Sequence, residues 1–244
     1  MIALRIDDIG ASTKVFNYYS KVRIFNFGIM RHRRLFGSWA PYEEMKQTQW
    51  IAIFNLLKER NAKLTVGITA SWVTKDAELI PFPKRFPDEA AVLREGLEEG
   101  LLEIANHGLT HCVLKNKKYK PKIWRSNRIY HREFWEWIDD KTHTNHIKKA
   151  QEILQEYFKV KITTLIPPGN VFALKTIKAA RQNGIKLINC QTVSGVTNGL
   201  KIIGNENVIA FHDREIVLEG VKWLKEKFST VLDNKKFCFV KELK

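Results

Sequence analysis

The stretch MIALRIDDIG (residues 1–10) joins a short apolar run to two adjacent carboxylates, Asp7 and Asp8. Residues 2–6 have the composition of a buried strand, and Gly10 follows where the chain has to turn. Successive side chains of a straight strand face opposite sides, so only one of the two carboxylates would reach a common site. We therefore expect the strand to stop or bulge at Asp7 and Asp8, so that both carboxylates reach one site.

The rest of the chain alternates apolar runs with segments of helical periodicity. Strands are predicted at residues 2–6, 64–69, 101–107, 161–166, 185–190, 208–211 and 237–240, and helices near 42–60, 88–99, 146–158, 173–182 and 214–228. Such alternation is typical of an α/β fold with a parallel sheet or barrel. The sequence has no linker rich in Gly, Ser or Pro and no internal repeat, which favours a single domain over residues 1–244.

Polar side chains gather directly after the predicted strands. They are Asp7 and Asp8 after the first strand, Asn106, His107 and His111 after the third, PPGN (residues 167–170) after the fourth, and His212 and Asp213 after the sixth. The carboxyl ends of parallel strands meet on one face of the sheet, where α/β proteins carry their functional groups. We therefore expect these side chains to form one site, in a chain that has only seven histidines.

His107 and His111 are four residues apart, a spacing that puts both rings on one side of a helical turn. Two neutral imidazoles and a carboxylate from the first strand would bind one divalent ion and leave positions open for water and substrate. Taken alone, such a histidine pair is at least as often a chance pair or a pair of capping residues. Together with the other strand ends, the pair predicts a catalytic metal site.

The order RIDDIG, HGLTH, LIPPGN and IAFHD resembles the polysaccharide deacetylase family, metal-dependent hydrolases that remove N- or O-acetyl groups from sugars. The resemblance extends from residue 2 to about residue 228. It implies a distorted (β/α)7 barrel in which Asp7 is the catalytic base and His212 is the general acid. It also implies that Asp8, His107 and His111 bind the metal.

The same resemblance implies the reaction and the cofactor. We expect hydrolysis of an acetyl group from an N-acetylated sugar or a related small amide, by attack of water held at the metal. Zn²⁺ is the expected ion, with Co²⁺, Ni²⁺, Fe²⁺ and Mn²⁺ as alternatives.

The chain departs from the family pattern in two places. Leu165 and Ile166 precede the Pro-Pro pair, where the family commonly has an arginine that orients the base. The sequence therefore leaves open what orients Asp7. The family's Asp-x-x-Asp-Trp element has no counterpart in CQTVSGVTNG (residues 190–199). The missing arginine favours a divergent member with another acyl substrate over a chitin specialist.

Three further residues are candidate substrate contacts. Pro168 and Asn170 would shape the floor of the pocket, with Asn170 next to the substrate or its oxyanion. Glu133 is either a substrate contact or part of the ordinary start of an amphipathic helix. His143 and His146 lie in polar stretches of sequence and are expected at the surface.

The net charge of +15 indicates an anionic partner. Much of the excess lies in a basic insertion, residues 113–132, which has eight Lys or Arg, no Asp or Glu, and Tyr119, Trp124 and Tyr130 among them. The insertion is either a solvated loop or a surface for a phosphorylated or anionic substrate, or for peripheral contact with a membrane. The rival to an enzyme is a non-catalytic barrel that binds nucleic acid or an anionic glycan. We favour the enzyme and its sugar substrate.

Location is inferred from three signals. No apolar run reaches the roughly 18 residues that would cross a membrane, and the first residues lack the pattern of a secretory leader. The three cysteines, Cys112, Cys190 and Cys238, are widely spaced and form no CxxC pair. A soluble cytoplasmic protein with reduced thiols is the resulting expectation.

Overall fold

One sheet forms the centre of the molecule, and β1 (Ile2–Ile9) lies in its interior. The computed structural model describes residues 1–16, 42–74, 76–113, 132–191, 195–197, 199–230 and 235–243. In this part of the chain the sheet order is β10, β1, β2, β5, β6, β7, β9, β8, and β11 pairs with the start of β1. These strands are β2 (Leu64–Ile68), β5 (Leu102–Asn106), β6 (Thr164–Leu165), β7 (Leu187–Asn189), β8 (Gly195–Thr197), β9 (Leu200–Ile203), β10 (Val208–His212) and β11 (Phe237–Cys238).

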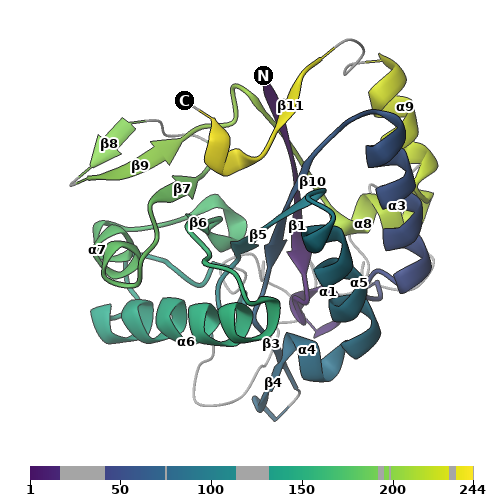
Figure 1. Ribbon diagram of the computed structural model, residues 1–244. Coiled ribbons are helices and arrows are strands. Elements are labelled where there is room, and N and C mark those ends of the chain that lie inside the picture. The colour runs from purple at the N-terminus through teal and green to yellow at the C-terminus, as the bar shows by residue number, and fades with distance from the viewer. Residues whose placement is uncertain are drawn as a thin grey trace, which may run out of the picture.

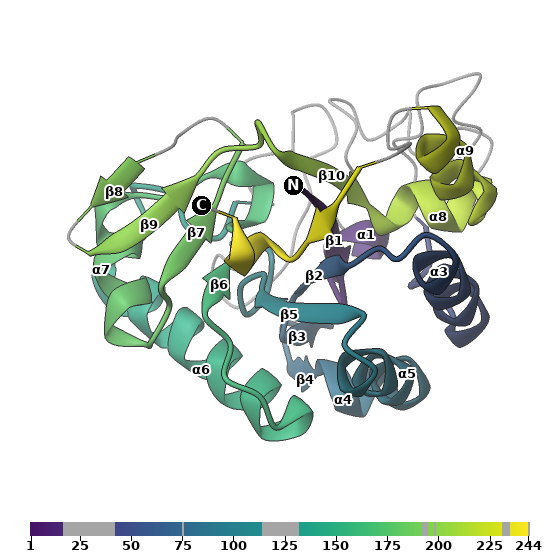
Figure 2. The same cartoon turned by 45° about the horizontal axis from the view of Figure 1, so that its top comes forward.

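Neighbouring strands of this sheet are parallel, except that β8 and β9 are antiparallel. The sheet is curved, and the helices are arranged around its outer side (Figures 1 and 2). This confirms the predicted α/β fold of the barrel type. No hydrogen-bonded pairing joins β10 to β8 among the described strands. A side-chain hydrogen bond joins the two halves of the sheet instead. Arg5 Nη1 in β1, next to β10, donates to Asn189 Oδ1 in β7, next to β9, over 2.5 Å.

Most helices lie between strands in chain order, and the longer ones bury one face. The helices are α1 (Thr13–Phe16), α3 (Gln47–Glu59), α4 (Phe82–Arg85), α5 (Pro87–Glu98), α6 (Asp140–Phe158), α7 (Leu174–Gln182), α8 (Asp213–Glu219) and α9 (Lys222–Thr230), with short 3₁₀ turns η4 (Pro168–Asn170) and η5 (Val240–Glu242). In α6 the buried stripe includes Ile147, Ala150, Leu154 and Phe158, at the spacing of one helix face. The apolar core lies between these helix faces and the sheet.

Element boundaries differ from the sequence prediction for identifiable reasons. Helix α6 begins at Asp140, ahead of the predicted start at residue 146, because Asp139 caps it by accepting from the Thr142 backbone N–H. The helix predicted at residues 214–228 is interrupted at Gly220, whose φ of 76° ends α8. The hairpin of β3 (Ser71–Val73) with β4 (Leu79–Pro81) and the β8–β9 pair were not predicted.

The first strand is longer than predicted and contains the expected irregularity. Strand β1 continues through both aspartates to Ile9, but its register with β2 shifts between Ile6 and Ile9. At this bulge Asp8 takes a left-handed backbone conformation, with φ of 71°. The prediction that the strand bulges at the aspartates is confirmed.

Most of the basic insertion, residues 114–131, lies outside the described residues. Its predicted contacts with an anionic substrate or a membrane surface therefore stay predictions. Among the described helices, none is long and apolar enough to cross a membrane.

Candidate metal centre

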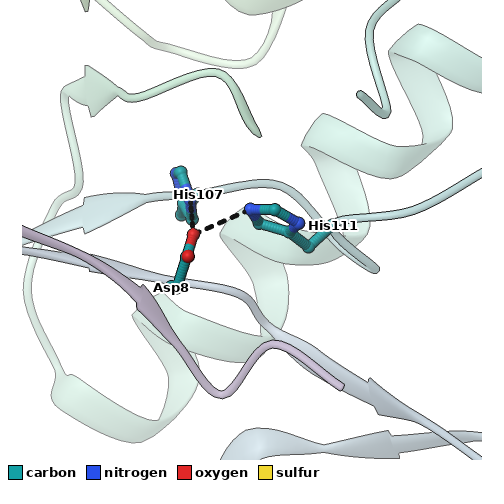
Figure 3. A group of neighbouring side chains, drawn as sticks. All are labelled: Asp8, His107 and His111. Carbon is teal, nitrogen blue, oxygen red and sulfur yellow. Dashed lines mark hydrogen bonds and ion pairs between the residues drawn. The ribbon is translucent and has the colours of Figure 1, made fainter. Parts of the chain in front are cut away.

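Asp8 lies between two histidines at the carboxyl ends of β1 and β5 (Figure 3). Its Oδ1 atom is 3.2 Å from His107 Nε2 and 2.9 Å from His111 Nε2. All three side chains are buried. The bulge in β1 is what turns Asp8 toward the histidines, because an unbroken strand would have pointed Asp7 and Asp8 to opposite faces.

The two histidines are held by their other ring nitrogens. His107 Nδ1 lies 2.7 Å from the Ile166 carbonyl oxygen, so Nδ1 carries the hydrogen and Nε2 faces Asp8. His111 Nδ1 lies 3.3 Å from Thr13 Oγ1. The helical turn predicted between the two histidines is absent. Residues 107–111 form an irregular loop instead, in which Gly108 has φ of 83° and His111 has φ of 56°. The rings nevertheless meet, with centroids 4.9 Å apart.

The charges in the site support one another. Burial disfavours the Asp8 carboxylate, but the charge of His111 and the hydrogen bonds of both imidazoles hold the pKa of Asp8 well below its usual range. Burial likewise disfavours a charged His107, but the hydrogen bond to Asp8 and the charges of Asp7 and Asp8 outweigh it and raise the pKa of His107. The buried Asp8 carboxylate thus favours a positive charge between itself and the two imidazoles.

A divalent ion fits this donor set. Asp8, His107 and His111 each offer one ligand atom, and these atoms lie within 4.8 Å of one another. Two imidazole nitrogens and one carboxylate oxygen are ligands that Zn²⁺ takes in open, catalytic sites. The set brings together the three residues predicted from the sequence.

Asp7 faces a different partner from Asp8. Its Oδ2 accepts from Arg5 Nη2 over 2.7 Å, and both side chains are buried. Its Oδ1 is buried and has no hydrogen-bond partner among the described residues. Gly67 leaves room for this oxygen, since a Cβ at Gly67 would lie 3.2 Å from Asp7 Oδ1. The sequence analysis missed Arg5, although it stands two residues before Asp7 and therefore on the same face of the strand.

His212 is directly opposite Asp7 in the pairing of β1 with β10. Its side chain is 43% exposed, and Nδ1 is 3.7 Å from Glu215 Oε2, too long for a hydrogen bond. The His212 backbone N–H donates to the same Glu215 oxygen over 2.7 Å at the start of α8. His212 thus lies at an open edge of the site, with a carboxylate close to its ring.

Glu133 is buried, and its carboxylate accepts from the backbone N–H groups of the loop that carries the histidines. Pro168 is buried and lies against Gly108, where an added Cβ would be 3.1 Å from Pro168 Cγ. Asn170 has φ of 54°, and its Oδ1 has no hydrogen-bond partner among the described residues. The predicted substrate contacts of these three residues stay predictions.

A second buried cluster of charges adjoins the site and was not predicted. Lys14 is fully buried, and its ammonium donates to Glu44 over 2.6 Å and to Asp213. Tyr42 Oη donates to the other Asp213 oxygen over 2.7 Å, and the Gly10 backbone N–H donates to Glu44 over 2.9 Å. Asp213 therefore anchors the start of α8 instead of contacting the ring of His212.

The prediction that His143 and His146 lie at the surface is wrong. His143 is fully buried and bonds to Thr176 Oγ1 over 2.9 Å. The side chain of His146 is 23% exposed, and its Nδ1 lies 2.5 Å from Glu133 Oε1. Both residues belong to α6, and His143 lies on the buried face of this helix, one turn before Ile147.

Comparison with known families agrees with the fold. The family described as polysaccharide deacetylase matches residues 40–188, which is well over half of the chain. No curated protein matches the sequence.

Solved structures share the fold at low sequence identity. They include BA3943, a CE4 family pseudoenzyme from Bacillus anthracis, with a TM-score of 0.51, 14% identity, and coverage of 100% of this chain and 64% of that chain. The Xyl-CE4 domain of a xylanase from the Trinervitermes trinervoides hindgut metagenome has a TM-score of 0.51, 12% identity, and coverage of 99% and 87%. A family 4 acetyl xylan esterase from Clostridium thermocellum, in complex with a cobalt ion, has a TM-score of 0.50, 13% identity, and coverage of 98% and 88%.

These likenesses show the fold alone. The chain spans 64% to 66% of the length of the BA3943 structures, and a mutant of that pseudoenzyme has restored enzymatic activity. The fold is thus shared by active and inactive proteins, and the side chains of the site have to carry any argument about chemistry.

Proposed function

The chain belongs to the polysaccharide deacetylase family, and from this we propose that it is a metal-dependent hydrolase that removes an acetyl group from an N-acetylated sugar or a related small amide. One observation carries the proposal. Asp8, His107 and His111 hold three ligand atoms within 4.8 Å, with Asp7 adjacent in sequence and His212 opposite Asp7 across the strand pair.

Asp8, His107 and His111 would hold the ion, for which Zn²⁺ is the first candidate and Co²⁺, Ni²⁺, Fe²⁺ and Mn²⁺ are alternatives. A bound ion of this kind polarises the acyl carbonyl and lowers the pKa of its water toward 7. The Ile166 carbonyl supports the site by fixing which His107 nitrogen carries the hydrogen.

Asp7 would act as the general base through Oδ1. Arg5 holds the opposite oxygen, Oδ2, at 2.7 Å, which fixes the plane of the carboxylate. Oδ1 has no partner among the described residues, so it is available to accept a proton from the attacking water. In this proposal Arg5, which lies in β1 itself, would orient the base, a role that the sequence left open.

His212 would give a proton to the leaving amine. Its ring is partly exposed at the edge of the site, with the Glu215 carboxylate 3.7 Å away. Asn170, with an amide oxygen that lacks a described partner, is the first candidate for a substrate contact, and Pro168 packs beneath the loop of the histidines.

The proposal is tested by acetate release and by metal content. Chelator-treated protein is reloaded with Zn²⁺ or Co²⁺ and assayed on chitin oligosaccharides, a nucleotide-linked N-acetyl sugar and acetylated xylan. Asp8→Asn, His107→Ala and His111→Ala are expected to lose the bound ion and the activity. Asp7→Asn is expected to keep the ion and to lose about 10²- to 10⁴-fold in kcat.

Asp88→Asn, which changes an exposed aspartate on α5, is the matched control and should behave as wild type. Unchanged metal content in all three ligand variants would overturn the metal site. Bound metal without acetate release from any of the substrates would overturn the activity and leave the metal site standing.

A further inference from the structure

Two of the three metal-ligand candidates lie on a loop without regular structure. The loop follows β5 and runs from His107 to His111, and Gly108 and His111 in it have positive φ values of 83° and 56°. Left-handed conformations of residues other than glycine persist only where the surroundings hold them. Something outside the loop therefore has to fix its shape.

The backbone of the loop converges on one side chain. Three successive N–H groups, of Leu109, Thr110 and His111, donate to the Glu133 carboxylate over 3.0, 3.2 and 2.9 Å. His146 Nδ1 is a fourth partner, at 2.5 Å from Oε1. Glu133 itself is only 2% exposed.

These contacts saturate the carboxylate. Oε1 takes Leu109 and His146, and Oε2 takes Thr110 and His111, which fills about four lone-pair sites. No acceptor position is left for a substrate hydroxyl. The approach is also close, because a Cβ at Gly108 would lie 2.2 Å from Glu133 Oε2.

We propose that Glu133 is a positioning residue that holds the loop in the shape in which His111 meets Asp8 and His107, with His146 holding Glu133 from α6. This rests on the proposed function, in which those three residues bind a metal ion. Without the carboxylate, three buried N–H groups lose their acceptor, and the loop relaxes away from the left-handed conformation of His111. Preorganisation of the ligands would be lost while the ligands themselves remain.

Metal affinity is the readout that separates this role from substrate contact. Zn²⁺ affinity is measured by competition with a chelator, and the ligand geometry by the visible absorption of the Co²⁺-loaded protein. For Glu133→Gln, which keeps the size of the side chain, we expect affinity about 10- to 100-fold weaker and an altered Co²⁺ spectrum. His146→Gln should show a smaller loss in the same direction.

Glu103→Gln is the matched control, because Glu103 is also buried and hydrogen-bonded, to Thr65 and Thr164, but away from the histidine loop. It should keep wild-type affinity even if it lowers stability. A folded Glu133→Gln protein with wild-type affinity and only a raised KM would overturn this inference alone. A wild-type protein that takes up no ion would overturn it together with the proposed function.

Discussion

At the scale of single residues, the Asp7 carboxylate has two oxygens in different surroundings. Arg5 binds Oδ2, and Asn189 in turn binds Arg5 while its own amide donates to the Ile203 carbonyl over 2.9 Å. This chain of contacts runs across the inside of the curved sheet and fixes the guanidinium. A positive charge held in this way can orient Asp7 without touching the substrate.

Arg5→Met should therefore lower kcat about 10- to 100-fold while KM and metal content change little, because a poorly oriented base slows only the proton transfer. In the Asp7→Asn background, Arg5→Met should have no further effect on kcat. Acetate-release kinetics of the four proteins of this double-mutant cycle make the measurement.

Arg94→Met, on the exposed surface of α5, is the control for loss of an arginine. If Arg5→Met leaves too little folded protein, as removal of one partner of a buried ion pair can do, Arg5→Lys keeps a charge and should retain part of the activity. Equal losses of kcat with and without the Asp7 carboxylate would show that Arg5 acts through stability and not through the base.

Sequence reasoning singled out the three candidate metal ligands because aspartates and histidines at strand ends are rare enough to stand out. Arg5 could have been found in the same way, since alternation along the strand places it on the face of Asp7. The contacts of Glu133 could not have been predicted, because three of its four partners are backbone N–H groups, which no sequence pattern marks.

At the scale of elements, the cluster of Lys14, Glu44 and Asp213 joins three segments around the site. Glu44 accepts from the turn that follows β1, and Asp213 begins α8 directly after His212. The Tyr42 backbone N–H donates to the Lys14 carbonyl oxygen over 3.0 Å, which fixes the segment leading to α3. If both carboxylates were ionised, Glu44 and Asp213 would carry two negative charges against the single positive charge of Lys14.

This imbalance of charge predicts a pH dependence of stability. Burial raises the pKa of Asp213 to about 8, with Lys14 opposing the rise and Glu44 and Asp8 adding to it. The unfolded chain loses the Asp213 proton near 3.8, so the folded protein binds one proton more between about pH 4 and 8. The contribution of Asp213 is therefore complete at low pH and is lost as the pH rises toward 8, by up to about 1.4 kcal/mol per pH unit.

Urea unfolding of metal-free protein between pH 5 and 8.5 checks this pH dependence. Asp213→Asn should flatten the decrease in unfolding free energy relative to wild type, because asparagine stands in for the protonated acid at every pH. Asp88→Asn should leave the slope as it is. A slope that Asp213→Asn does not change would mean that Asp213 is ionised in the folded protein throughout this range.

The long elements with clear apolar periodicity were predicted within a few residues, and the short ones were missed. The Asn-Gly pair at residues 198–199 is a strong hairpin signal and stands between β8 and β9. The hairpin was not predicted because β8 and β9, with three and four residues, are too short to show the alternation of apolar and polar side chains. The start of α6 was missed because its first turn is polar, so only the cap at Asp139 marks it.

At the scale of the whole molecule, the two ends of the curved sheet have different roles. The three candidate metal ligands and Asp7 lie at the carboxyl ends of β1 and β5. The opposite end, where β1 and β10 start, holds a separate apolar cluster from segments far apart in sequence, with residues Ala3, Leu187, Ile203, Val208, Cys238, Val240 and Leu243. The last of these belong to β11 and the turn after it, so the C-terminal segment closes this end.

Separation of the two roles predicts that packing at the closed end affects stability but not the site. Val240 is fully buried, and Val240→Ala removes two methyl groups and leaves a cavity, which should lower the free energy of unfolding by about 2 kcal/mol. Metal affinity and kcat should stay at wild-type values, because the site and this cluster share no residues. As a control, Leu174→Ala changes a side chain that is 78% exposed and should alter the unfolding free energy by less than about 0.5 kcal/mol. Urea unfolding and Zn²⁺ competition are measured on the same preparations. A weaker Zn²⁺ affinity in Val240→Ala would show that the two ends of the sheet are coupled through the strands.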